Sequence, residues 1–255
     1  MILTVLGSGT SVPHRARSSS AFWLETGNGS LMLDFSPSAI HRMAEEGLDW
    51  ANLDAVWISH FHLDHAGGLA PFLFGTKYAP DTRGRTKPLR IFGPKGLRKL
   101  LDAFDRANDY EFFKQPFPVE MIEVEPLEKF EILPGATAVA ASTPHTEESC
   151  AIHIRDEKGS SLVFTSDTGF SKKIAAFARR ADLFVLECSF VKNKPVEKHL
   201  ELAEAVFLIR RAGPKRALLV HLYPEWDEVD FAEEVGRFDP GIEIIEAVDG
   251  LRIEV

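Results

Sequence analysis

The most informative stretch of the chain runs from Trp57 to Gly68 and has the sequence WISHFHLDHAGG. Three histidines and one aspartate fall within six residues, directly after an apolar run that predicts a strand over Ala55–Ser59. Clustered imidazole and carboxylate groups are costly to bury without partners, whereas they are the ligands that zinc, iron and manganese accept. The stretch therefore predicts a metal site. The alternative, a polar helix start, leaves the clustering unexplained.

Three further candidate ligands follow predicted strands later in the chain. His145 follows a strand over Thr137–Ala141, Asp167 follows one over Leu162–Thr165, and His221 ends one that begins at Ala217. Sheet folds gather their active sites at strand ends. The complete candidate set is large enough for two ions and comprises His60, His62, Asp64, His65, His145, Asp167 and His221.

The hydrophobic pattern of the whole chain predicts an α/β fold. Apolar runs predict strands in two groups, the first between residues 2 and 92 and the second between residues 120 and 254. Helical patterns interrupt both groups, at Ser38–Glu46, Leu97–Arg106, Ser171–Arg180, Glu197–Ala212 and Glu228–Phe238. Two mixed sheets packed face to face with helices outside are the expected architecture. No linker is evident, so a single domain over residues 1–255 is expected.

Composition restricts the cellular setting and the partners. The chain is 45% hydrophobic, yet it has no apolar run of the roughly 20 residues that span a bilayer. A cytoplasmic protein with no membrane partner is expected. The net charge of −9 opposes a polyanionic partner, so RNA is not favoured. Basic residues do cluster between residues 77 and 90. They predict either a solvated loop or one that contacts phosphate.

The run HFHLDHAGG, from His60 to Gly68, resembles the HxHxDH signature of the metallo-β-lactamase superfamily, and the later candidate ligands follow in that family's order. The resemblance implies a four-layer αββα sandwich and two divalent metal ions. Zinc is the expected metal, with manganese or iron as alternatives. The implied first site is His60, His62 and His145, the implied second site is Asp64, His65 and His221, and Asp167 is implied to bridge them. Asp64 is expected to be both ligand and catalytic residue.

Within that superfamily, the opening LGSGTSVP at residues 6–13 and the segment around His199 resemble ribonuclease Z and related phosphodiesterases. The resemblance implies that His199 gives a proton to the leaving group. Glu187, at the end of a predicted strand, is expected to orient His199. For Asp34, supporting a ligand histidine and a purely structural role are equally consistent with the sequence. The resemblance also allows a homodimer.

Departures from the family narrow the function. Only 22 positions separate His145 from Asp167, too few for the tRNA-gripping arm of ribonuclease Z. The leading hypothesis is therefore a phosphodiesterase for a small phosphodiester or cyclic nucleotide, hydrolysed by a hydroxide held between two metal ions. The alternatives are a ribonuclease Z-like RNA 3′-processing nuclease, a hydrolase of carboxylic esters, lactones or thioesters, and a metal-binding sensor or adaptor without turnover.

Overall fold

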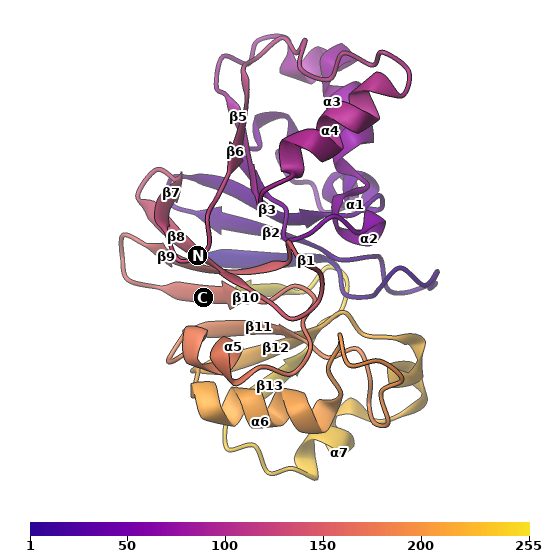
Figure 1. Ribbon diagram of the computed structural model, residues 1–255, viewed down its shortest axis with the longest axis vertical. Helices are drawn as coiled ribbons and strands as arrows, with labels where there is room; N and C mark the ends of the chain where they lie inside the picture. The colour runs from indigo at the N-terminus through magenta and orange to yellow at the C-terminus, as the bar shows by residue number, and fades with distance from the viewer.

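The computed structural model describes residues 1–255, and its strands form two seven-stranded sheets (Figure 1). The first sheet contains, in spatial order, β14 (Arg252–Glu254), β1 (Ile2–Gly7), β2 (Ala21–Thr26), β3 (Gly29–Phe35), β4 (Ala55–Trp57), β5 (Leu89–Gly93) and β6 (Val119–Glu123). The second contains β13 (Glu243–Glu246), β12 (Arg216–Val220), β11 (Leu183–Glu187), β10 (Ser161–Phe164), β9 (Cys150–Asp156), β8 (Ala136–Ser142) and β7 (Lys129–Leu133).

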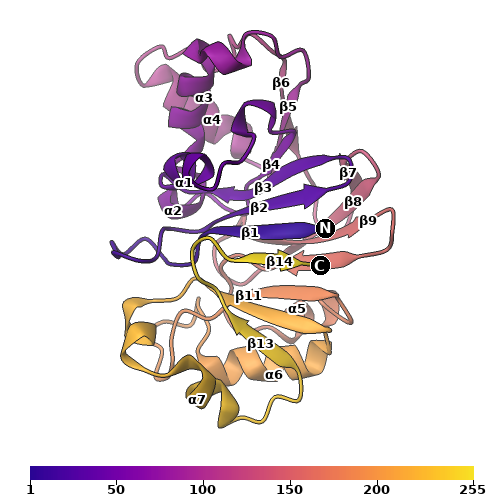
Figure 2. The ribbon, with the colours of Figure 1, turned by 180° about the vertical axis from the view of Figure 1, so that it is seen from behind.

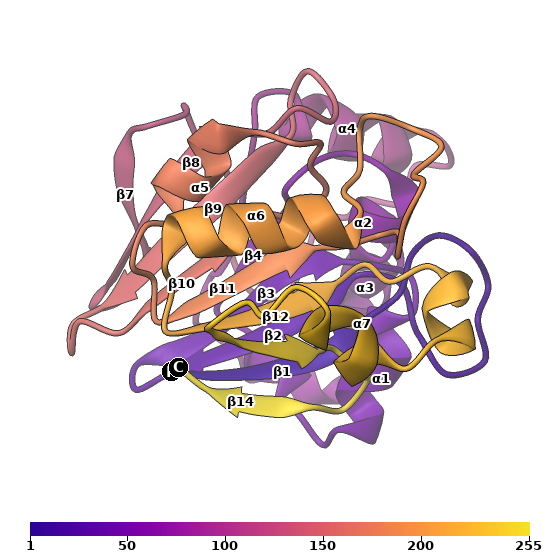
Figure 3. The ribbon, with the colours of Figure 1, turned by 90° about the horizontal axis from the view of Figure 1, so that it is seen from below.

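Helices cover the outer faces of both sheets. Those on the first sheet are α1 (Ala39–Glu45), α2 (Leu63–Ala66), α3 (Leu69–Tyr78) and α4 (Leu97–Arg106). Those on the second are α5 (Lys172–Phe177), α6 (Leu202–Ala212) and α7 (Phe231–Gly236), with α6 lying across the sheet (Figure 3). Three short 3₁₀ helices complete the elements, at Trp50–Asn52, Pro80–Thr82 and Pro224–Glu228. None of the helices combines the length and the apolar character needed to cross a lipid bilayer.

Three apolar clusters fill the spaces between the four layers. The largest, with 26 buried residues, lies between the two sheets. A cluster of 22 packs the second sheet against α5–α7, and one of 21 packs the first sheet against its helices. In β11, Leu183 and Val185 face the central cluster, whereas Phe184 and Leu186 face the helices. Strands buried on both faces require such continuous apolar runs. The predicted αββα sandwich is confirmed.

Several predicted elements differ in detail. The strand β14 belongs beside β1, in the sheet of the first half, although its sequence position suggested the second group (Figure 2). The strand β7 was not predicted, because its sequence KFEIL alternates charged and apolar residues at the edge of the sheet. Helix α6 begins at Leu202 rather than at Glu197, because Glu201 and Glu204 form a capping box there.

Parallel pairing brings many strand ends to one edge of the sandwich. The strands β3, β4, β5 and β6 are mutually parallel, as are β10, β11, β12 and β13. The carboxyl ends of parallel strands share one edge, where α/β folds bind their ligands. The candidate ligands after β4, β10 and β12 follow such ends. His145 follows β8, which pairs antiparallel with both of its neighbours but runs in the same direction as β10.

Candidate metal centre

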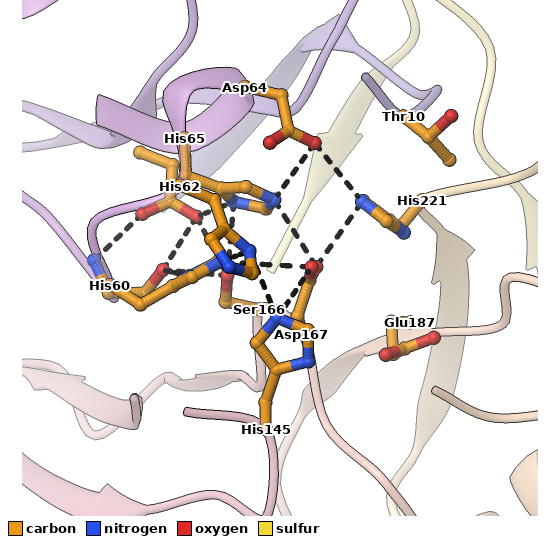
Figure 4. Close-up of polar contacts among 12 residues, drawn as sticks. Thr10, His60, His62, Asp64, His65, His145, Ser166, Asp167, Glu187 and His221 are labelled. Atoms are coloured by element: carbon orange, nitrogen blue, oxygen red, sulfur yellow. Dashed lines mark hydrogen bonds and ion pairs between the residues drawn. The ribbon is translucent and has the colours of Figure 1, made fainter. Parts of the chain in front are cut away.

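The candidate ligands come from both sheets and converge between them (Figure 4). Those of the first sheet follow β4 and extend into α2, namely His60, His62, Asp64 and His65. Those of the second sheet follow β8, β10 and β12, namely His145, Asp167 and His221. Residues that lie up to 161 positions apart in the sequence, from His60 to His221, thus meet at one place.

Three imidazole nitrogens form the first cluster. His62 Nδ1 lies 3.1 Å from His60 Nε2 and 3.2 Å from His145 Nε2. Asp167 Oδ2 completes the group, 3.5 Å from His145 Nε2 and 3.8 Å from His60 Nε2. In a tetrahedral zinc site with Zn–N distances of about 2.0–2.1 Å, the nitrogens lie about 3.3 Å apart. The spacing of these four atoms fits a cation at their centre.

The second cluster uses the other oxygen of Asp167. Asp167 Oδ1 lies 3.3 Å from His65 Nε2 and 3.4 Å from His221 Nε2. Asp64 Oδ2 lies 3.6 Å from each of the same two nitrogens. The two oxygens of one carboxylate therefore face two different clusters.

Buried polar atoms without partners test whether these residues suit a metal. His65 Nε2, His221 Nε2 and Asp167 Oδ1 are all buried and make no hydrogen bond. A buried polar atom without a partner costs about 1–3 kcal/mol, so three at one point call for an additional group. Neutral imidazole nitrogens and carboxylate oxygens are donors that divalent cations accept. The residues present fit divalent metal ions.

The outward-facing nitrogens of these histidines are held by hydrogen bonds. His65 Nδ1 donates to Asp34 Oδ2 at 2.7 Å, and His145 Nδ1 donates to the carbonyl oxygen of Lys198 at 2.9 Å. Because carboxylate and carbonyl oxygens only accept, the proton of each ring is on Nδ1 and the lone pair on Nε2 faces the cluster. Asp34 thus lies where it supports a candidate ligand, as one of its two predicted roles requires.

Glu187 is a fully buried carboxylate beside the two clusters. Its Oε1 accepts from His199 Nδ1 at 2.9 Å and from the backbone N–H of Thr168 at 2.8 Å. Its Oε2 accepts from Ser189 Oγ at 2.8 Å, and Ser189 Oγ in turn accepts from His221 Nδ1 at 3.0 Å. His199 also places a ring nitrogen within 4.8 Å of ligand atoms of Asp167 and His221. One carboxylate therefore orients both His199 and a candidate ligand.

The electrostatics of the site follow from burial and close charges. Burial, with the neighbouring histidines, lowers the pKa of His60 to about 2, which keeps this imidazole neutral. Burial opposes a charge on His65 as well, but without a cation Asp167 and Asp34 outweigh it and raise its pKa well above the ordinary value. A metal ion at Nε2 would displace the proton there and leave the proton on Nδ1. Burial likewise opposes a charge on His199, and the hydrogen bond to Glu187 outweighs it and raises the pKa.

Three residues of the site have a left-handed backbone. The φ angles are 56° at Asp34, 52° at Ser166 and 58° at His221. Such conformations cost non-glycine residues about 1–3 kcal/mol each and concentrate at functional sites. Here each strained position aims a polar side chain at the clusters or at their supports.

Sequence reasoning missed three supporting serines. Ser166 Oγ donates to Asp34 Oδ2 at 2.8 Å, and Ser59 Oγ lies 3.0 Å from His60 Nδ1. The third is Ser189, whose Oγ accepts from His221 Nδ1. Serine is common on surfaces and carries no spacing signature. The only signal was position, since Ser59 directly precedes His60 and Ser166 directly precedes Asp167.

Basic residues of the stretch 77–90 make hydrogen bonds and ion pairs with other parts of the chain. Arg85 is 7% exposed and donates to four backbone carbonyls, including those of Ala51 and Leu53. Lys77 pairs with Glu111, and Lys87 pairs with Asp54. These contacts favour a structural role over contact with phosphate.

Comparisons with known proteins agree with this geometry. The family model described as the beta-lactamase superfamily domain matches residues 25–222. Ribonuclease Z from Shouchella clausii (strain KSM-K16) is 25% identical over 300 residues, covering 96% of this chain and 95% of the relative. Over the whole chain, the fold resembles the metallo-β-lactamase fold protein YhfI from Bacillus subtilis, covering 98% of that chain with a TM-score of 0.81 and 21% identity.

A diphosphatase of the PhnP family also shares the fold over the whole chain, covering 97% of that protein with a TM-score of 0.76 and 23% identity. Between His145 and Asp167, the present chain has only the hairpin of β9 and β10. The family match includes strands of both sheets and all the candidate ligands. The chain therefore belongs to the beta-lactamase superfamily, with the metallo-β-lactamase fold, in the branch of hydrolases that resemble ribonuclease Z.

Proposed function

We propose that the protein is a phosphodiesterase with two metal ions, most suited to a small phosphodiester or a cyclic nucleotide. The observation that carries this proposal is the placement of Asp167, whose two oxygens face two separate clusters of metal-ligating atoms. Zinc is the proposed metal, because the donors are mainly imidazole nitrogens at tetrahedral spacing. Family membership supports a hydrolase, while the bond and the substrate belong to the proposal.

Divalent cations at these positions would lower the pKa of a bound water toward neutrality and balance the negative charge of a phosphoryl group. Side chains of the protein would donate the proton to the leaving group and hold the candidate ligands in position. Glu187 holds His199 through Nδ1, so that the other ring nitrogen is free to give a proton to the departing oxygen. Asp34 and Ser189 fix the rings of His65 and His221. These supports keep the candidate ligands in place before substrate arrives.

A ribonuclease Z-like activity on RNA is the second candidate. The match to ribonuclease Z over 96% of this chain favours it. The short connection between His145 and Asp167, the net charge of −9 and the internally paired basic residues favour a smaller substrate.

Metal analysis combined with a substrate panel tests both candidates. Protein loaded with zinc or manganese would be assayed on bis-p-nitrophenyl phosphate, a cyclic nucleotide, a precursor tRNA and a lactone. We expect two bound ions per chain and hydrolysis of the phosphodiesters. Asp167→Asn should lose bound metal and activity together, whereas Asp109→Asn, in an exposed loop, should lose neither. Turnover of the lactone without any phosphodiester would overturn the proposal.

A further inference from the structure

A cavity of about 660 Å³ is lined by residues from the two segments that carry His60, His62 and His145. One wall is the ring of Phe61, whose chain neighbours are the candidate ligands His60 and His62. Leu100 and Ala103 of α4 supply further apolar surface. The volume falls in the range of about 300–1,000 Å³ that is usual for small-molecule sites. It is large enough for a nucleotide-sized group.

The cavity lies along the same edge of the sandwich as the clusters. The strands β4, β5 and β6 are adjacent and parallel, so the segments that follow them lie side by side. The segment after β4 carries His60, the segment after β5 carries Lys95, and the segment after β6 carries Glu125. The last two line the cavity. The candidate ligands themselves do not line the cavity, which is formed by residues next to them along this edge.

Two lysines of the cavity have no acidic partner. Lys95 precedes α4 and Lys99 is in its first turn, four positions later, and both are exposed. Neither makes an ion pair, although Lys77, Lys194 and Lys215 all do. Unpaired ammonium groups at the mouth of a cavity suit an anionic group of a ligand.

Gly96 keeps this end of the cavity open. Its φ angle is +103°, and a Cβ atom there would lie 3.1 Å from the ring of Phe61. A side chain at this position would thus be strained and would crowd the aromatic wall. The absence of a side chain at Gly96 therefore leaves Lys95, Lys99 and the ring of Phe61 accessible from the same cavity.

Carboxylates also line the cavity, one after β6 at Glu125 and two after β8. Glu147 and Glu148 line the cavity, and Glu148 Oε1 accepts weakly from the backbone N–H of Phe61 at 3.4 Å. Carboxylates would repel a polyanion, but they accept hydrogen bonds from the amino groups of nucleobases. An aromatic face, two cations and the carboxylates of Glu125, Glu147 and Glu148 suit a base with a separate phosphate.

We propose that this cavity binds the nucleotide next to the scissile phosphodiester, with Lys95 and Lys99 on a terminal phosphate. The inference rests on the proposed phosphodiesterase activity and narrows its substrate. The preferred substrate is then a short linear oligonucleotide with a phosphorylated end rather than a cyclic mononucleotide.

Three forms of diadenylate test the subsite: one without terminal phosphate, one with a 5′-phosphate and one with a 3′-phosphate. We expect the wild type to have a KM at least tenfold lower for one of the phosphorylated forms. The double variant Lys95→Ala/Lys99→Ala should lose this discrimination. Lys173→Ala, which removes an exposed lysine of α5, should retain it. Equal KM values for all three forms in the wild type, or discrimination that persists in the double variant, would overturn the inference.

The subsite and the activity can fail separately. Calorimetric titration of the same three diadenylates measures the Kd ratio even if no diadenylate is hydrolysed. A preference for a phosphorylated form that is lost in the double variant, without hydrolysis, would support the subsite and contradict the phosphodiesterase. Hydrolysis without any such preference would support the phosphodiesterase and contradict the subsite.

Discussion

Among single residues, His199 offers the sharpest test of chemistry, because its Nδ1 is held by the buried Glu187. Proton donation matters for a poor leaving group such as an alkoxide and little for p-nitrophenolate. His199→Gln should therefore lower kcat by about 100- to 10,000-fold on a diester with an alkyl leaving group. The loss on bis-p-nitrophenyl phosphate should be below about tenfold by the same reasoning.

The matched control is His41→Gln, which alters a 79% exposed histidine of α1 and should change neither rate. Equal losses of His199→Gln on both substrates would show that the residue supports the site without donating a proton. Metal content, measured on the same samples, separates lost metal from lost proton transfer.

The predictability of the site also differs residue by residue. The convergence of the seven candidate ligands was predictable, because imidazoles and carboxylates are costly to bury and their clustering in sequence is rare. Ser59, Ser166 and Ser189 were not, because only the folded backbone decides whether a serine hydroxyl is aimed at a ligand or at another support. Ser166, for example, meets Asp34 across 132 positions. The same holds for the carbonyl oxygen of Lys198, which any residue could supply.

Among the elements, α3 has one glycine at its N-cap and one in its interior, and the two have opposite requirements. A Cβ atom on Gly68, at the start of the helix, would lie 2.1 Å from the carbonyl oxygen of Ser36, whereas one on Gly75 would meet nothing within 4 Å. Gly68→Ala should lower the free energy of unfolding by about 1–3 kcal/mol through overpacking. Gly75→Ala should raise it by about 0.5–1 kcal/mol, since alanine suits a helix interior.

Urea denaturation of the two variants in parallel measures these changes. The pair forms its own control, because the same substitution is made at the N-cap and in the interior of one helix. A destabilising effect of Gly75→Ala, or a neutral effect of Gly68→Ala, would contradict the packing of α3 against the end of β3.

The junction of β10 and β11 should make stability depend on pH. Asp182 accepts from the backbone N–H of Ser161 at 2.7 Å and from its Oγ at 2.8 Å, and pairs with Lys215. Partial burial opposes the charge, but Lys215 and Ser161 outweigh it and lower the pKa of Asp182. A lowered pKa means that this stabilisation is present above the unfolded pKa, about 3.9, and is lost as pH falls through the folded pKa.

Asp182→Asn should consequently reduce the free energy of unfolding by about 1 kcal/mol at pH 7, and the difference from wild type should shrink toward pH 3. Urea titrations at several pH values measure this difference. Glu128→Gln, in an exposed turn without an ion pair, should match the wild type throughout. A difference that grows on acidification would contradict the assignment.

Most elements were predictable because strands buried on both faces have continuous apolar sequences and helices have a different period. Edge elements were harder. The strand β7 alternates charged and apolar residues, and the short β14 finds its partner β1 only through long-range pairing. The start of α6 was placed too early, because the stretch Glu197–Glu201 has helical composition but is held as a loop by contacts of Lys198 and His199. Local pattern carries no information on such distant contacts.

For the whole molecule, the origin of the candidate ligands has a thermodynamic consequence. His60, His62, Asp64 and His65 are attached to one sheet, whereas His145, Asp167 and His221 are attached to the other. Ions bound among these residues would link the two sheets, and unfolding would have to release the ions. The melting temperature should therefore rise with free zinc and fall with a chelator.

The dependence of stability on free zinc gives the number of ions that the folded protein binds. Above saturation, each tenfold increase in free zinc adds about 1.4 kcal/mol of stability for every ion released on unfolding. Thermal melts at several free zinc concentrations would therefore measure the number of bound ions without any substrate. The stability of the wild type should change with zinc as expected for two ions, and that of Asp167→Asn should change less. A protein that binds no metal between its sheets would show no dependence on zinc.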